Sequence, residues 1–274
     1  MQAHFKIRSA HPVAENIRTA VLEALADIER KHDVTVLYAC ESGSRAWGFA
    51  SPDSDYDVRF IYIHRLPWYL TVNARRDVIE LPINDVLDVS GWELRKTLQL
   101  LLASNPVLLE WLDSPIVYRA EPEILQRLRT LAGDYFSSIK GHYHYLHMAR
   151  NNFRGYLQTE SVRLKKYLYV LRPLLAVCWI EAGKGHPPMR FADLATGVLN
   201  DAPLLEEIDR LLEIKMSAAE TEYSPRWPRI HAFIEQELER LEGIPAAKEA
   251  LPEGMRAALD AFLMETVLRF SGST

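Results

Sequence analysis

Two acidic residues, Asp55 and Asp57, stand one residue apart at the head of an apolar, β-branched run over residues 58–63. Because alternate residues of a strand face the same way, this spacing directs both carboxylates to one side of a predicted strand. Two carboxylates that close raise each other's pKa unless a cation lies between them. Hard oxygen ligands select Mg²⁺ or Mn²⁺, and Mg²⁺ commonly takes further ligands from substrate phosphates. The pair is therefore typical of metal-dependent nucleotide chemistry.

A Gly43-Ser44 pair follows the strand-like run over residues 34–39 and predicts a tight turn. Glycine lets backbone N–H groups point into a concavity, and the serine hydroxyl can donate to a phosphate. A short helix is expected over residues 42–49, and its N-terminal N–H groups would add to the same anion site. For Arg45, contact with a substrate phosphate and a brace to a neighbouring carboxylate are both open, because a guanidinium suits either.

A short predicted strand that ends at Asp88 just before a helix is what a third active-site carboxylate would need. A helix would follow, with Ser90 as its N-cap and Glu93 at the capping-box position. Asp85 lies at the opposite parity from Asp88, so one of the two should face the cleft. Glu80, one strand earlier, is a further competitor. A carboxylate that merely flanks the helix cap is the other interpretation of Asp88.

A second group of candidates lies on a helix predicted over residues 159–182, which is otherwise strongly apolar. Its members are Lys165, Lys166, Tyr169 and Arg172. Positions four and three residues apart share a helix face, and a solvated basic face is the usual explanation. A cation on a mostly buried helix, however, needs a partner, and a triphosphate is one. We expect that contact from Lys165 or Lys166, whereas for Arg172 a buried structural salt bridge is equally open.

The elements that must position these residues divide along the chain. Strands are expected over residues 34–39, 56–64 and 78–83, followed by the one that ends at Asp88, all within the first 90 or so residues. From Asn105 onward the pattern is helical. A small α/β domain followed by a helical domain is the natural division.

Composition sets the remaining bounds. The 274 residues are 48% hydrophobic and 25% charged, which is typical of an ordinary globular protein. The sequence has no run of about 18 apolar residues and no basic-then-apolar leader, so we expect a cytoplasmic protein with no membrane partner. The net charge of −5 argues against a broad nucleic-acid surface but not against a local basic cleft. No RNA-binding pattern with aromatic stacking positions stands out, and the oligomeric state is not predicted.

Two other groups of reactive side chains have a plainer interpretation. Cys40, beside the predicted turn, is expected to be a buried small residue. His142, His144 and His147 fall on a predicted helix, where the last two, three residues apart, could share a face. No cysteine or third histidine stands at zinc spacing, so a packed helix surface is the preferred interpretation.

The Gly43-Ser44 pair followed by Asp55-Tyr56-Asp57 resembles the DNA polymerase beta-like nucleotidyltransferase superfamily. Later stretches are similar to one branch, the RNA-ligase-associated (RlaP-like) predicted nucleotidyltransferases, and the resemblance covers roughly residues 30 to 190. These stretches are Gly43-Ser-Arg-Ala-Trp-Gly48, Asp88-Val-Ser-Gly-Trp-Glu-Leu-Arg-Lys96, Ser104-Asn-Pro106 with Glu110-Trp-Leu112, and Lys165-Lys-Tyr-Leu-Tyr-Val-Leu-Arg-Pro173.

The resemblance implies an α/β fold with a small mixed-sheet nucleotidyltransferase domain, residues 1–115, and a mainly helical domain, residues 116–274, that completes the cleft. It implies Mg²⁺- or Mn²⁺-dependent transfer of a nucleotidyl group from a nucleoside triphosphate such as ATP to an acceptor hydroxyl. The acceptor is open, and the family context suggests RNA repair. Asp55, Asp57 and Asp88 would be the metal ligands and catalytic carboxylates. A catalytically silent nucleotide-binding or antitoxin-like module and a metal-dependent phosphohydrolase are the alternatives.

Overall fold

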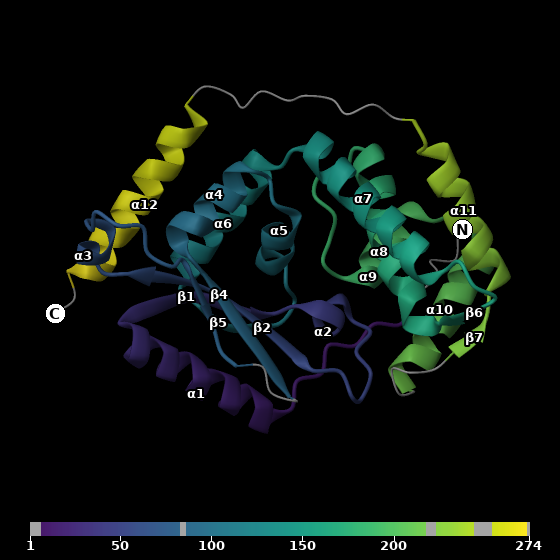
Figure 1. Ribbon diagram of the computed structural model, residues 1–274, viewed down its shortest axis with the longest axis horizontal. Coiled ribbons are helices and arrows are strands. Elements are labelled where there is room, and N and C mark those ends of the chain that lie inside the picture. Colours follow the sequence, from purple (N-terminus) through teal and green to yellow (C-terminus); the bar gives the residue numbers. More distant parts are fainter. Residues whose placement is uncertain (1–6, 83–85, 218–222, 244–253, 273–274) are drawn as a thin grey trace, which may run out of the picture. The chain divides into compact units, whose positions relative to one another are not determined.

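The computed structural model describes residues 7–82, 86–217, 223–243 and 254–272. The helices of these residues (Figure 1) are α1 Glu15–His32, α2 Gly43–Trp47, α3 Leu66–Tyr69, α4 Leu94–Leu102, α5 Pro106–Leu112, α6 Pro122–Tyr135, α7 Ser138–Tyr156, α8 Leu164–Glu181, α9 Phe191–Val198, α10 Ala202–Ser217, α11 Pro228–Arg240 and α12 Met255–Ser271. The strands are β1 Val34–Glu41, β2 Tyr56–His64, β3 Val78–Glu80, β4 Leu87–Glu93, β5 Val117–Ala120, β6 Ser161–Arg163 and β7 Tyr223–Pro225.

The chain forms two compact units. The sheet unit comprises Pro12–Gly43, Asp55–Tyr135 and Ala250–Thr274, and the helical unit comprises Met1–His11, Ser44–Ser54 and Phe136–Glu249. Each unit is therefore assembled from three separate stretches of sequence. The predicted functional domains, residues 1–115 and 116–274, are a different partition, and they stay a prediction.

The sheet unit is built on a five-stranded mixed sheet in the order β3-β4-β2-β1-β5. β2 and β4 run parallel, and the other neighbouring pairs are antiparallel. β1 is buried along nearly its whole length, because α1 packs against β1 and β5 while α6 also contacts β1. α4 and α12 pack against β2 and against each other. The expected mixed α/β fold is confirmed.

Strand alternation in β2 separates its apolar core residues from its charged ones. Val58, Phe60 and Tyr62 belong to the hydrophobic cluster that includes Val21, Leu25 and Ile28 of α1. Asp57 and Arg59 have the opposite parity, so they project to the other side of the sheet. The α1 cluster thus fixes the register, because a one-residue slip would bury the charged side chains instead.

The region around β4 differs from the prediction. The strand does not end at Asp88 but runs over Leu87–Glu93, so Ser90 lies within it and α4 begins at Leu94. Glu93 is itself the N-cap, and its carboxylate accepts a hydrogen bond from the Arg95 N–H at 2.6 Å. Pairing with β2 along the whole of β4 satisfies more backbone groups than a local cap at Ser90 would.

The expectation that strands end near residue 90 was also wrong. β5 pairs with the free edge of β1, and β6 and β7 form a two-stranded sheet in the helical unit. These strands have three or four residues each. Segments that short do not establish a period of two, so the sequence pattern could not distinguish them from loop or helix.

The helical unit packs around α8. Most apolar residues of α8 are buried, with Trp179 partly exposed, which confirms the buried course predicted for this helix. α7 lies along α8, and α9, α10 and α11 also contact it. The helix begins later than expected, at Leu164, because the preceding residues pair with β7.

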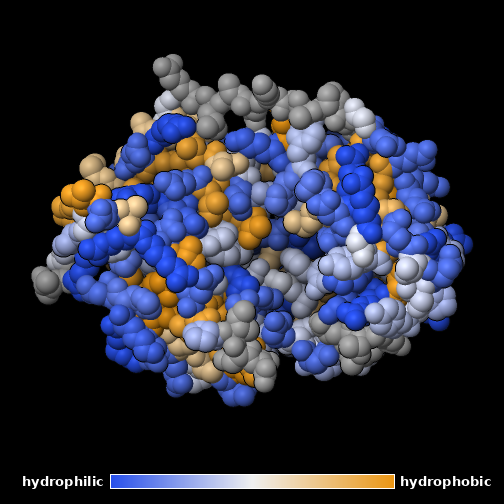
Figure 2. Space-filling model, in the orientation of Figure 1, coloured by the Kyte–Doolittle hydropathy of each residue, from blue (hydrophilic) through white to orange (hydrophobic). Residues whose placement is uncertain are grey.

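Hydrophilic residues cover most of the face of the molecule shown in Figure 2. In the part of the chain that the structure describes, no helix combines the length and the apolar composition needed to cross a membrane.

A close contact at Gly91 leads to a stability prediction. A Cβ atom there would lie 2.3–2.4 Å from three ring atoms of Phe60, which is fully buried on the neighbouring strand. We expect Gly91→Ala to lower the free energy of unfolding by about 1–3 kcal/mol, because the ring cannot retreat within a packed core. Urea unfolding measures the change. As the control, Gly133→Ala on α6 meets nothing within 4 Å and should raise the stability by up to about 1 kcal/mol.

His64 makes the stability of the protein depend on pH. Its ring is stacked on Trp68 with centroids 4.3 Å apart. Burial, helped by the charge of Arg75, lowers the pKa of His64 from 6.5 to about 4. Between those values the unfolded chain binds a proton that the folded chain does not, so stability falls as the pH falls. We expect His64→Gln to remove about 1 kcal/mol of the loss between pH 7.5 and pH 5, because solvent screens part of the effect at this half-buried ring. Equal losses in both proteins during urea unfolding would contradict this assignment.

Candidate functional site

Asp57 and Asp88 meet at the start of the parallel strands β2 and β4, where they are direct partners in the strand register. The guanidinium of Arg59 bridges them, because its Nη2 lies 2.9 Å from Asp57 Oδ1 and 2.7 Å from Asp88 Oδ2. Arg59 also donates through Nη1 to the Asp88 carbonyl oxygen at 2.9 Å. The side chains of the three residues are only 17–27% exposed. Two carboxylates therefore share one cation in a partly shielded place.

Asp55 continues the alternation of Asp57 and Arg59 but precedes β2 and is exposed. Within residues 7–82, 86–217, 223–243 and 254–272, no three Asp, Glu, His or Cys side chains are grouped closely enough to hold a metal ion. The structure thus brings Asp57 and Asp88 together without Asp55. Two carboxylates still fit a divalent cation by donor type, because Mg²⁺ is commonly held by one or two carboxylates plus substrate phosphates.

The competing carboxylates are placed differently. Glu80 ends β3, where its exposed side chain forms an ion pair with Arg76, four residues earlier. Asp85 lies outside the described residues. The choice of Asp88 as the third catalytic carboxylate stays a prediction, although its position opposite Asp57 is a fact of the register.

The predicted glycine turn lies against the carboxylate of Asp57. Gly43 has φ +59°, and a Cβ atom there would lie 2.0 Å from Asp57 Oδ2. The Ser42 N–H donates to the Asp57 carbonyl oxygen at 2.8 Å, so the turn is fastened to the start of β2. Only a residue without a side chain can hold the backbone this close to the acid.

Glu41, which the sequence pattern did not single out, fixes the backbone at Asp57 beside the Gly43 turn. It is fully buried at the end of β1, where it accepts a hydrogen bond from the Asp57 N–H at 3.0 Å. The Tyr118 hydroxyl donates to its other carboxylate oxygen at 2.5 Å. An acidic residue ending an apolar strand was the available sign of this role. The neighbouring Cys40 is fully buried as expected, and burial raises the pKa of its thiol to about 12.

Ser44 and Arg45 belong to the helical unit, where a run of hydroxyl groups holds their loop. Ser44 Oγ donates to Ser54 Oγ at 3.3 Å, and Ser54 Oγ lies 2.9 Å from Ser51 Oγ. The ammonium group of Lys215, only 5% exposed, donates to Ser51 Oγ at 2.6 Å. Arg45 is also 5% exposed and donates to the Ser54 carbonyl oxygen at 2.9 Å. Nothing in the local sequence pattern pointed to Lys215, because it is far from this loop in the chain.

The candidates on α8 contact aromatic rings. Arg172 is buried, with its Cζ 4.6 Å from the ring centroid of Trp47, and Tyr169 meets the same indole edge-on at 6.1 Å. Lys166 Nζ lies 3.7 Å from the ring centroid of Tyr156. A buried salt bridge was considered for Arg172, and the contact that the structure gives here is with the ring of Trp47. The nucleotide roles of Lys165, Lys166, Tyr169 and Arg172 stay predictions.

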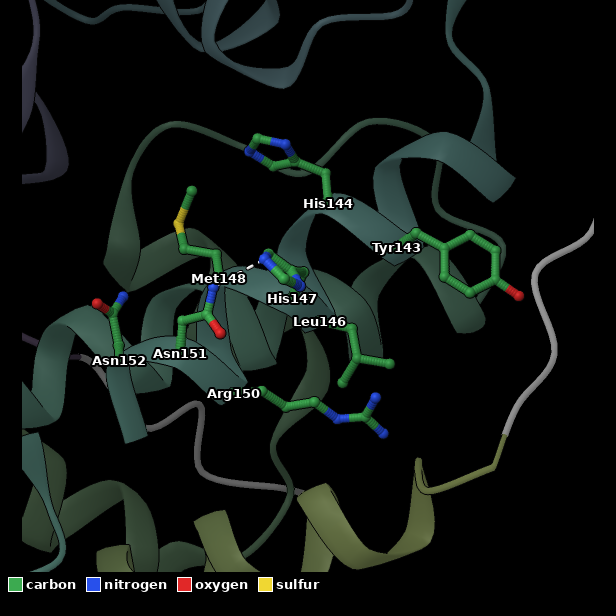
Figure 3. A pocket seen from close by; sticks show the side chains of 8 residues that line it. All are labelled: Tyr143, His144, Leu146, His147, Met148, Arg150, Asn151 and Asn152. Carbon is green, nitrogen blue, oxygen red and sulfur yellow. Dashed lines mark hydrogen bonds between the residues drawn. The ribbon is translucent and has the colours of Figure 1, made fainter. Parts of the chain in front are cut away.

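A hollow of about 760 Å³ lies along α7 and includes two of the histidines. Figure 3 shows the side chains that line it: Tyr143, His144, Leu146, His147, Met148, Arg150, Asn151 and Asn152. The ring of His147 is hydrogen-bonded to the Asn151 side-chain amide at 2.7 Å, and the Asn152 side-chain amide donates to the Tyr169 carbonyl oxygen at 2.9 Å. The latter bond ties α7 to α8 beside the candidate residues.

The contact between Gly43 and Asp57 can be tested by a double-mutant cycle. We expect Gly43→Ala to lower the free energy of unfolding by about 1–2 kcal/mol for the left-handed backbone alone, and by more because of the carboxylate. In the Asp57→Ala background the added methyl group no longer meets the carboxylate, so the same substitution should cost less. Urea unfolding of the four proteins gives the coupling. Strictly additive changes would contradict the contact.

Comparison with known proteins places the chain in a family. Residues 17–265 match RlaP, the RNA repair pathway DNA polymerase beta family. The chain is 47% identical over 253 residues to the uncharacterized protein YcgL of Bacillus subtilis (strain 168), a match that covers 92% of this chain and 96% of that protein. It is also similar to the crystal structure, at 1.90 Å resolution, of a nucleotidyltransferase-like protein from Exiguobacterium sibiricum 255-15, with 15% identity and a TM-score of 0.32 over 93% of this chain and 90% of that one. Because the family match spans most of its length, the chain belongs to the RlaP family of polymerase beta-like nucleotidyltransferases.

Proposed function

We propose that this protein transfers a nucleotidyl group from a nucleoside triphosphate to an acceptor hydroxyl and releases pyrophosphate. The observation that carries the proposal is the meeting of Asp57 and Asp88 against the Gly43 turn. Membership of the RlaP family supports the reaction class. The family description also names an RNA repair pathway, so an RNA end is the acceptor we favour and ATP the first nucleotide to test.

In the proposed reaction the acceptor oxygen attacks the α-phosphorus, and the bond from that phosphorus to the bridging oxygen of pyrophosphate breaks. Asp88 takes the hydroxyl proton. Asp57 would hold Mg²⁺ or Mn²⁺, with Asp88 and Asp55 as the further ligands predicted from the sequence, and the ion would neutralise charge on the phosphates. The Gly43 backbone and the Ser44 hydroxyl would hold the leaving phosphates, with Lys165 or Lys166 as a further contact. Arg59 donates to both carboxylates, and a cation between two acids offsets their repulsion.

Two alternatives use the same site differently. A silent nucleotide-binding or antitoxin-like module would bind a triphosphate without turnover. A phosphohydrolase would pass the nucleotidyl or phosphoryl group to water and need no acceptor. Labelled triphosphate incubated with the protein and metal alone separates these cases, because hydrolysis without RNA or protein supports the second alternative.

The proposal predicts that Asp57→Asn abolishes transfer while the protein stays folded. The substitution keeps the shape of the side chain but removes the charge that would hold the metal, so we expect a loss of at least about 100-fold. Asp88→Asn should lose about 10²–10⁴-fold, the usual contribution of a general base. The measurement is incorporation of each α-labelled nucleotide into total cellular RNA or protein with Mg²⁺ or Mn²⁺. Glu80→Gln, an exposed acid on the neighbouring edge strand, is the matched control and should retain activity.

Normal turnover by Asp57→Asn would show the metal assignment to be wrong. Equal losses in Glu80→Gln and Asp88→Asn would leave the choice of the third carboxylate without support. Calorimetry that finds no metal-dependent triphosphate binding by the unmodified protein would rule out the transferase itself.

A further inference from the structure

A second hollow, of about 440 Å³, lies within the helical unit where α7 ends and the β6–β7 sheet begins. Its lining comprises Gly155, Tyr156, Thr159, Ser161, Val162, Arg163, Lys166 and Tyr223. Of these described lining residues two are cationic and none is acidic. Pairing of Arg163 with Tyr223 in the β6–β7 register holds the two sides of the hollow together.

Two of the lining tyrosines are exposed, and each lies beside a cation. Tyr156 is 45% exposed and Tyr223 57% exposed. Lys166 Nζ lies 3.7 Å from the Tyr156 ring centroid. Arg163 Cζ lies 5.2 Å from the Tyr223 centroid, and its Nε–H donates to the tyrosine hydroxyl at 2.7 Å. The rings are therefore held in place by their cations while much of their surface stays open to solvent.

The sequence from the end of α7 to the start of α8 is locally basic. Residues 154–166 carry four cationic side chains and one acid, Glu160, in a protein whose net charge is −5. The carboxylate of Glu160 is 94% exposed and lies 4.0 Å from Arg226. Arg226 also donates to the carbonyl oxygens of Gln158 and Thr159, at 2.7 and 3.0 Å, which fixes the loop at the rim. An anionic ligand is the partner that this concentration of positive charge favours.

We propose that this hollow binds a single-stranded polynucleotide, with backbone phosphates on Arg163 and Lys166 and bases stacked on Tyr156 and Tyr223. A cationic groove combined with aromatic platforms is the arrangement that binds single strands without sequence preference. A duplex hides the faces of its bases, and an acidic peptide would use the cations but not the rings. The hollow then binds the acceptor strand through Lys166, which leaves Lys165 as the lysine for the triphosphate. This assignment rests on the proposed transferase activity, whereas strand binding itself does not.

Fluorescence anisotropy with a labelled single-stranded oligouridylate of about 12 nucleotides, without triphosphate or metal, tests the proposal on the full chain. Tyr156→Leu or Tyr223→Leu should weaken binding about 5- to 150-fold. Tyr156→Phe should bind as the unmodified protein does, because the ring and not the hydroxyl stacks. Lys166→Ala should lower the slope of log affinity against log salt by about 0.7. Lys184→Ala is the matched control and should bind as the unmodified protein does. Lys184 also lies over a ring, with its Nζ 5.2 Å from the Trp179 centroid, but it follows the opposite end of α8, and the helix rises roughly 22 Å from Lys166 to Glu181.

Binding that is unchanged in the Tyr156→Leu and Lys166→Ala variants would overturn the proposal, as would equal affinity for duplex RNA of the same length. Displacement of the RNA by polyglutamate at equal charge concentration would show that the rings contribute nothing, and would overturn it too. The two proposals fail separately. If the protein binds the single strand but shows no labelling that depends on Asp57, the transferase proposal is wrong. If labelling occurs but the strand does not bind at these tyrosines, the hollow is not the acceptor site.

Discussion

The site depends on one electrostatic constraint, the placement of two carboxylates on adjacent parallel strands with a guanidinium between them. Asp57 and Asp88 are opposite each other in the β2–β4 register, and neither can move away without disturbing the sheet. Arg59, two residues beyond Asp57 on the same face, supplies the charge that makes this placement tolerable. The pairing is partly shielded from solvent, so the interaction is stronger than that of an exposed ion pair and still accessible to a ligand.

The corner around the acids is held by backbone contacts that a side chain would block. Gly43 brings the turn against the Asp57 carboxylate, and the buried Glu41 accepts a hydrogen bond from the Asp57 N–H. On the opposite face of β2, the strand that carries Asp57, the side chains of Val58, Phe60 and Tyr62 pack in the core under α1. A single register therefore sets both the apolar packing and the position of the charged groups, so that stability and site geometry are linked.

In the helical unit, cations are divided by what surrounds them. Arg45, Arg172 and Lys215 are buried, where carbonyl, ring and hydroxyl contacts offset part of the cost of desolvation. Arg163 and Lys166 instead lie beside exposed tyrosines at the β6–β7 sheet. The first group fixes the loop that carries Ser44 and the packing of α2 on α8. The second remains available to an outside partner.

Local pattern was enough to determine the alternation of Asp55 and Asp57, the bounds of β2, the glycine turn and the buried course of α8, because each depends on residues close together in the sequence. The same alternation contained Arg59, whose role could have been read from it. Tertiary structure alone decided that β4 extends past Ser90, that Asp88 faces Asp57, and that Lys215 supports the Ser51 loop. It also decided that Tyr156 and Tyr223 line one hollow. These relations join segments distant in the chain, and strand pairing and burial, which have no local period, determine them.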